Sequence, residues 1–328
     1  MKFFLPFESV ALLGLLVLGG CAKNKEVDPS ITNIAVTDPD FQRLEEAAIR
    51  GDVAVTLGNK NAADPQGNFT VFAPTNAAFA RLGLNSAQDL TALQPGFLRS
   101  TLLYHVFSGT LPGGALTPGS APSGSLLGPT RRIVRRADGS LYVNGSKILK
   151  TDVRAANGLI HPIDKVLLAT GGDIVQSAQA LEAAQVFTKP ELTFLVEAVK
   201  YADLVGTLKS AGPFTVFAPT DQAFRDLGVA LNTPLTQPSD IRKLAKATVR
   251  ALLLTHALGG ALGGRFTSEL PAGTSVTSAG GDPVTLGAFT NGVFTVQGKG
   301  NAAPANMVIP DVQCTNGVVH VIDRVLLP

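Results

Sequence analysis

The strongest constraint on this 328-residue chain is an internal duplication. The segment FTVFAPTNAAF at 69–79 returns as FTVFAPTDQAF at 214–224, with nine of eleven positions identical. The segment NGLIHPIDKVLL at 157–168 returns as NGVVHVIDRVLL at 316–327, with eight of twelve identical. A third pair of similar segments begins at Thr37 and Thr188. Blocks that recur in the same order predict two tandem units, domain 1 at residues 31–170 and domain 2 at 171–328, each long enough to bury its own core.

Local patterns predict helices early in each domain. Apolar residues recur at helical spacing in both copies, as Phe41, Leu44, Ala48 and Ile49 in the first and as Leu192, Leu195, Val196 and Val199 in the second. Thr75 and Thr220 follow Ala-Pro and are expected to cap short helices that carry the last Phe of each block. Residues 173–186 are expected to form a linking helix.

Strands are predicted around and after these helices. The mixture of aromatic and β-branched residues in FTVFA predicts a strand that ends at the following proline. Asp138-Gly139 and Asn291-Gly292 predict tight hairpins. The Asn-Gly blocks near the end of each domain open into strands rich in Val, Ile and Leu. The fold class is therefore α+β, with the sheet of each domain completed late.

The N-terminus predicts a processing signal. The apolar run from Val10 to Leu18 follows Lys2 and is too short to span a bilayer, which needs about 20 residues. The segment LGGC that ends at Cys21 resembles a bacterial lipobox, whose cysteine receives a lipid. We expect residues 1–20 to be a lipoprotein signal peptide and 21–30 a tether that anchors the chain in the cell envelope, at the outer membrane or cell surface. An ordinary secretory signal is the alternative.

Composition excludes several classes of function. The chain has 27 basic and 25 acidic residues, a balance too even for a nucleic-acid-binding surface. Two cysteines cannot build a disulfide framework or a four-ligand zinc site. The sequence lacks a G-x-S-x-G elbow, a P-loop and an H-E-x-x-H motif. We therefore expect no catalysis, no cofactor and no metal, and interpret Cys314 as a small buried hydrophobic residue.

The four histidines occupy equivalent positions in the two domains, His105 with His256 and His161 with His320. The spacing H-x-x-D, from His161 to Asp164, could offer two metal ligands, but residues three apart on a strand point to opposite faces. We expect His161 and His320 to be neutral and bonded to the backbone inside the core. Asp152 and Asp311 are expected to bond backbone groups in loops. Structural roles are thus assigned to Asp152, His161, Asp164, His256, Asp311, His320 and Asp323.

The repeated blocks resemble the two signatures of the fasciclin-type domain, F-x-x-F-A-P-x-x-x-A-F and N-G-x-x-H-x-x-D-x-x-L. The resemblance covers nearly all of the mature chain. It implies two domains, each a β-wedge or small barrel of about seven strands flanked by short helices. It also implies a role in extracellular adhesion, with glycans, matrix or other cells as partners. The family often carries a Tyr-His pair between the signatures; domain 1 has Tyr104-His105, whereas domain 2 has Thr255-His256.

Two groups in domain 1 are candidate contacts for a partner. The resemblance makes Tyr104 and His105 adhesion candidates, although the Tyr ring could instead be packed with its hydroxyl bonded. The second group is the basic cluster of Arg131, Arg132, Arg135 and Arg136. Such a cluster could bind the anionic groups of a glycan or lipopolysaccharide, or could be a solvated edge strand.

Two functions remain open from the sequence. In the first, the chain is a non-catalytic adhesion or interaction module, attached to the membrane through lipidated Cys21. In the second, it is a surface lipoprotein that binds a small hydrophobic or glycan ligand.

Overall fold

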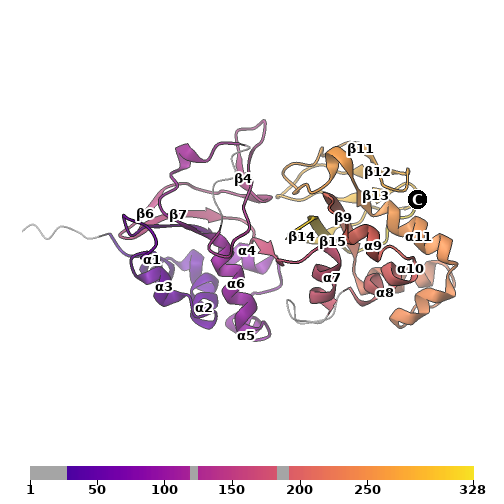
Figure 1. The fold of residues 1–328 in the computed structure, drawn as a ribbon, viewed down its shortest axis with the longest axis horizontal. Helices are drawn as coiled ribbons and strands as arrows, with labels where there is room; N and C mark the ends of the chain where they lie inside the picture. The colour runs from indigo at the N-terminus through magenta and orange to yellow at the C-terminus, as the bar shows by residue number, and fades with distance from the viewer. Residues whose placement is uncertain (1–27, 119–124, 183–191) are drawn as a thin grey trace, which may run out of the picture.

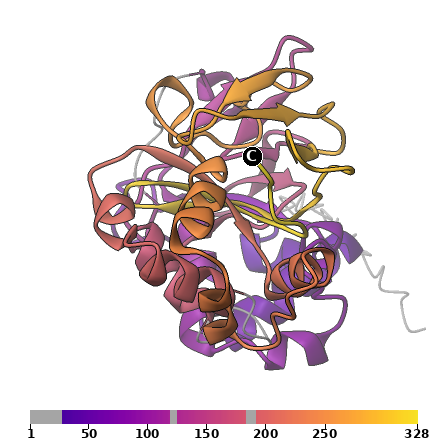
Figure 2. The ribbon, with the colours of Figure 1, turned by 90° about the vertical axis from the view of Figure 1, so that its right-hand side faces the viewer.

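The computed structural model describes residues 28–118, 125–182 and 192–328. Domain 1 and domain 2 lie side by side and repeat the same arrangement (Figure 1). In both domains most helices gather on one side, and a three-stranded sheet lies on the opposite side (Figure 2). The α+β class predicted from the sequence is confirmed.

Domain 1 contains most of its helices before its hairpins. Its helices are α1 (Ile31–Thr37), α2 (Gln42–Arg50), α3 (Ala54–Gly58), α4 (Asn76–Ala80), α5 (Ala87–Thr91) and α6 (Pro95–His105). Its strands are β1 (Phe69–Pro74), β2 (Val106–Ser108), β3 (Ile133–Arg135), β4 (Leu141–Val143), β5 (Ser146–Lys147), β6 (Val153–Ala155) and β7 (Gly158–Ile163), followed by β8 (Leu168–Ala169). Two short 3-10 helices span Pro39–Phe41 and Gly113–Ala115.

Domain 2 follows the same order. Its helices are α7 (Ile174–Glu182), α8 (Thr193–Tyr201), α9 (Val205–Lys209), α10 (Asp221–Ala230) and α11 (Lys246–Thr255), with 3-10 helices at Pro238–Lys243 and Gly260–Leu262. Its strands are β9 (Phe214–Pro219), β10 (Ala257–Leu258), β11 (Ser275–Thr277), β12 (Pro283–Leu286), β13 (Val296–Gly298), β14 (Met307–Cys314) and β15 (Gly317–Ile322).

The duplicated blocks form the centre of each domain. The FTVFAP segments become β1 and β9, and each pairs in parallel with the strand of the Asn-Gly block, β7 or β15. The register matches, because Phe72 lies opposite His161 just as Phe217 lies opposite His320. The prediction that these residues occupy equivalent backbone positions is confirmed.

Each central strand separates two cores. In β1, Val71 and Ala73 pack into the core beneath the helices, whereas Phe72 packs into a second core beneath the three-stranded sheet. This alternation is what a strand buried on both faces requires. Within the described ranges, β2-β1-β7-β6 and β3-β4-β5 form separate sheets and do not close into a barrel. The wedge arrangement rather than the barrel is therefore the correct description.

Local signals in the sequence explain several boundaries. The Thr75 hydroxyl accepts from the backbone N–H of Ala78 and so caps α4, and Thr220 caps α10 in the same way. Asp138-Gly139 lies between the antiparallel strands β3 and β4, which confirms that hairpin. At Asn291-Gly292 the turn is closed by a single bridge between Thr290 and Val293. The linking helix is described over Ile174–Glu182, and its predicted last residues, 183–186, lie outside the described ranges.

The strand β8 connects the domains. It follows β7 in sequence but pairs in parallel with β14, so that Leu168 lies opposite Val312. The predicted boundary at Gly171 therefore comes just after a strand that completes the sheet of domain 2, β10-β9-β15-β14-β8.

Candidate functional site

His105 and His256 each connect the C-terminal end of a helix to the last segment of their domain. The Nδ1 atom of His105 lies 2.7 Å from the carbonyl oxygen of Thr101, and its Nε2 atom accepts from the N–H of Leu167 at 2.9 Å. His256 repeats both bonds in domain 2. Because a carbonyl only accepts and an amide N–H only donates, each ring carries its single proton on Nδ1.

The other two histidines have the opposite tautomer. In His161 and His320, Nδ1 accepts from the backbone N–H of Asp152 or Asp311 at 3.1 Å. Their Nε2 atoms lie 2.9 and 3.1 Å from backbone carbonyl oxygens, to which they donate. Burial lowers the pKa of all four histidines, to about 4 for His105 and His256. The backbone bonding predicted for His161 and His320 is confirmed, and His105 and His256 are bonded to the backbone as well.

The aspartates of the repeated blocks fix loops by accepting from backbone N–H groups. This confirms the role expected of Asp152 and Asp311. The pairs are Asp152 with Gly113 (2.9 Å), Asp311 with Thr267 (2.7 Å), Asp164 with Lys147 (2.7 Å) and Asp323 with Asn306 (2.7 Å). Among the described residues, no group of three or more His, Cys, Asp or Glu side chains could hold a metal ion.

Tyr104 and His105 are buried, with exposed fractions of 0% and 1%. The Tyr104 hydroxyl donates to Oε1 of Gln313 in domain 2, and Asn144 donates to both groups. The alternative in which the ring packs and the hydroxyl is bonded is therefore the correct one. The prediction that these two residues contact an outside partner is wrong, because both side chains are buried and their polar atoms are bonded within the protein.

The arginine cluster is also not an open anion-binding surface. Arg131 has an exposed fraction of 0%, and burial lowers its pKa to about 10. Its guanidinium lies 5.1 Å from the centre of the Phe72 ring and donates to the carbonyl oxygens of Tyr104 and Val106. Arg131 is thus part of the core, held by cation–π contact and backbone acceptors.

Two further members of the cluster bind domain 2. Arg132 forms an ion pair with Glu269 at 2.9 Å, and Arg136 lies 3.9 Å from the centre of the Phe289 ring. Arg135 is exposed and bonds the carbonyl oxygen of Gly139 in its own hairpin. The prediction that four arginines together bind anionic partners is wrong, since the side chains of Arg131, Arg132 and Arg136 make contacts within the protein.

A buried ion pair between the domains was not predicted. Lys165 Nζ lies 2.6 Å from Oδ2 of Asp311, with both side chains at least nine-tenths buried. The ammonium group also donates to the Thr267 hydroxyl at 3.1 Å and to the Gly292 carbonyl at 2.8 Å. All three donor positions of Lys165 are therefore satisfied by domain 2.

Cys314 is buried as expected, and burial raises the pKa of its thiol to about 11. A thiol in this state is not a nucleophile at neutral pH. Within the described ranges, no helix combines the length and the apolar composition needed to cross a membrane.

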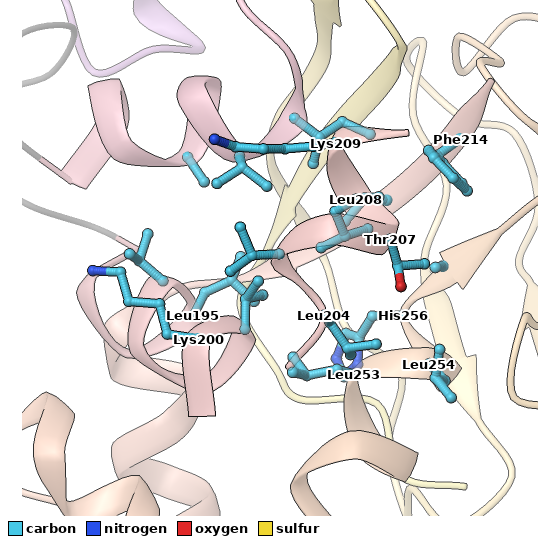
Figure 3. Close-up of a pocket in the computed structure, with 18 of the residues that line it drawn as sticks. Leu195, Lys200, Leu204, Thr207, Leu208, Lys209, Phe214, Leu253, Leu254 and His256 are labelled. Carbon is cyan, nitrogen blue, oxygen red and sulfur yellow. The ribbon is translucent and has the colours of Figure 1, made fainter. Parts of the chain in front are cut away.

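A cavity of about 250 Å³ lies in domain 2 between α7, α8, α9, α11 and β9 (Figure 3). Its walls are mainly aliphatic, with Leu195, Leu204 and Leu208 among them, and His256 lies at its floor. Lys200 and Lys209 extend from the same region toward its rim. This cavity is a candidate ligand site that the sequence patterns did not reveal.

Domain 1 has a hollow of about 90 Å³ in the equivalent place, between α1, α2, α3, α6 and β1. Three large apolar side chains are exposed on the helices that enclose it: Val36 of α1 at 52%, Ile49 of α2 at 63% and Val55 of α3 at 73%. Val36 and Ile49 line the hollow, and Val55 follows Ala54, which also lines it. We call Val36, Ile49 and Val55 the apolar patch. Ile49 was expected on the buried face of its helix, and its exposure is a correction to that pattern.

Comparisons with known proteins agree with the repeated architecture. The family model of the fasciclin domain matches residues 39–169 and 190–328. The chain is 30% identical over 264 residues to transforming growth factor-beta-induced protein ig-h3 of Oryctolagus cuniculus, covering 80% of this chain and 35% of that relative. The chain thus spans about a third of the length of that protein.

Shorter relatives match a single domain. The uncharacterized protein sll1735 of Synechocystis is 40% identical over 134 residues, which cover 40% of this chain and 86% of that protein. A solved FAS1 domain pair from the insect cell adhesion molecule fasciclin I aligns with a TM-score of 0.40 and 17% identity, covering 88% of this chain and 97% of that one. With both of its halves matched by the same family model, the chain belongs to the fasciclin domain family and carries two copies of the domain in tandem.

Proposed function

We propose that this chain is a non-catalytic adhesion or interaction module of the bacterial cell surface, anchored through a lipid on Cys21. Membership in the fasciclin domain family supports this class of function, since the family resemblance implies extracellular adhesion. The partners we propose are molecules of other cells or of the matrix.

The observation that carries this proposal is the apolar patch of domain 1. Scattered exposed apolar residues are normal, but a group on neighbouring helices beside a hollow is a candidate interaction surface. Val36, Ile49 and Val55 come from α1, α2 and α3, which pack against one another. The equivalent positions of domain 2 hold Gln179, Lys200 and Gly206, so the patch belongs to domain 1 alone.

The patch predicts a loss of attachment on substitution. The triple variant Val36→Ser, Ile49→Ser and Val55→Ser should reduce the attachment of protein-coated beads to cells or matrix about tenfold, because the contact loses its desolvated apolar groups. The thermal midpoint should change little, since all three side chains are already exposed. Bead attachment and thermal unfolding are measured on the same preparations.

A matched control is available in domain 2. Val229, Leu231 and Val308 are likewise exposed apolar residues but lie away from the hollow of domain 1. Changing these three to Ser should leave attachment unchanged. Equal attachment by both triple variants and the unmodified protein would remove the patch from the proposal, and no attachment by the unmodified protein would remove adhesion itself.

The anchor is tested separately. Cys21→Ser should move the protein from the membrane fraction to the soluble fraction or leave the precursor uncleaved, because the acylated thiol is the proposed attachment point. Cys314→Ala, which changes the only other cysteine, is the control and should not alter fractionation. A mature protein whose intact mass shows no lipid, or that begins at another residue, would contradict the anchor.

A second candidate function is the binding of a small hydrophobic ligand. The cavity of domain 2 favours it, because mainly apolar walls around a single hollow are typical of ligand sites. Adhesion through domain 1 and ligand binding in domain 2 use different surfaces, so one does not exclude the other.

A further inference from the structure

The two domains have diverged at one equivalent place. Leu44 and Ala48 of α2 line the hollow of domain 1, and Leu195 and Val199 of α8 line the cavity of domain 2. Both histidines at the helix ends, His105 and His256, also line these spaces. The same backbone therefore encloses about 90 Å³ in domain 1 and about 250 Å³ in domain 2.

The interior of the larger cavity offers almost no free polar group. Both ring nitrogens of His256 are already bonded to the backbone. Most side chains that line the cavity are apolar, among them Leu204, Leu208 and Val216, and its other polar uncharged members are Gln179 and Thr207. Whatever occupies this space must be a hydrocarbon, because a polar group placed there would lose its hydrogen bonds to water without replacement.

The rim differs from the interior and from its counterpart in domain 1. Lys200 and Lys209 are exposed, and within the described ranges neither takes part in an ion pair. Figure 3 shows both ammonium groups on the same side of the cavity. The equivalent residues of domain 1 are Ile49 and Gly58, so only domain 2 combines an apolar interior with a positively charged rim.

We propose that the cavity of domain 2 binds a free fatty acid, with the acyl chain between α7, α8 and β9 and the carboxylate at Lys200 and Lys209. The size favours one chain, because about 250 Å³ lies below the usual range of roughly 300–1,000 Å³ for drug-sized ligands. A carboxylate matches the charge of the rim and remains in water. This inference rests on the second candidate function and specifies its ligand class.

The test compares two probes of equal chain length, decanoate and 1-decanol, by calorimetric titration of residues 22–328. Decanoate should bind at least tenfold more tightly than 1-decanol. The double variant Lys200→Gln/Lys209→Gln should weaken decanoate binding about tenfold and leave 1-decanol unchanged, because it removes charge only at the rim. The matched control is Lys150→Gln/Lys299→Gln, two exposed lysines that do not line the cavity, and it should bind like the unmodified protein.

A second experiment fills the cavity with a larger side chain. Ala178→Phe places a ring among the lining residues and should abolish the binding of both probes. Thr207→Phe, at an exposed lining position, does the same with less risk to the fold. Decanoate binding that survives both changes would overturn the assignment of the site. Equal binding of the two probes would overturn the fatty acid while leaving a hydrophobic ligand in place, and binding of neither would remove both.

Discussion

Asp311→Asn should lower the free energy of unfolding by about 3 kcal/mol, because it leaves the Lys165 ammonium buried without its counter-charge. The substitution keeps the shape of the side chain, and Asn tolerates the positive φ of 66° at this position. Urea unfolding at neutral pH measures the change. The loss should appear in the docking of the domains, since the pair joins residues from both.

The duplication provides the control for this experiment. Asp152 is the equivalent residue of domain 1, with φ of 63° and the same bond to a histidine, but it is exposed and pairs with no lysine in the part of the chain that the structure describes. Asp152→Asn should cost less than about 1 kcal/mol. Lys165→Met should be as harmful as Asp311→Asn, and the double variant less harmful than their sum. Equal effects of Asp152→Asn and Asp311→Asn would contradict the role given to the ion pair.

Stability should fall steeply when the pH is lowered from 7 to 5. In the unfolded chain a histidine binds a proton below pH 6.5, but His105 and His256 stay neutral in the folded chain down to about pH 4. The unfolded state therefore binds more protons between these values, so stability is complete above pH 6.5 and is lost as the pH falls toward 4. At pH 5 the loss is about 2 kcal/mol for each of these two histidines.

Three aspartates have pKa shifts that act away from this window. Hydrogen bonds from Ser86, Ser140 and Thr236 lower the pKa of Asp89, Asp138 and Asp240 from the ordinary value of an aspartate. Urea unfolding at pH 7.5, 6 and 5 measures the effect, and His105→Gln/His256→Gln should flatten the profile. A free energy of unfolding that is constant from pH 7.5 to 5 would contradict the buried, neutral state of the histidines.

The parts of the fold that could be predicted are those encoded by short sequence motifs that occur in both domains. The pairing of Phe72 with His161 recurs in domain 2, because both domains contain the same two sequence blocks. The Thr that follows Ala-Pro caps a helix in both domains, as Thr75 and Thr220. The contacts between the domains could not be predicted in this way. Each of them occurs once in the molecule, so the repeated blocks give no second example of it. Gln313, which accepts from the Tyr104 hydroxyl, corresponds to Arg154 in domain 1, whose side chain is chemically different.

The candidate sites were mispredicted for a related reason. A cluster such as Arg131–Arg136 is usually solvated, and nothing in the sequence states that a neighbouring domain covers it. The cavity of domain 2 depends on the volume left between five elements, which no periodic pattern records. Positions at which the two copies differ in charge, such as Ile49 and its equivalent Lys200, could have indicated where the domains differ in function.

The pairing of β8 with domain 2 determines which segment of the chain can be transferred to another protein as a unit. Tandem domains are commonly treated as modules that recombine one at a time, cut at the linker. Here Leu168 and Ala169, the last strand of domain 1, lie along β14, so a cut at Gly171 leaves the edge of that strand without its partner. Unpaired strand edges invite pairing with other chains. The smallest transferable module is therefore domain 2 together with the last strand of its neighbour, and fusions should begin before Leu168.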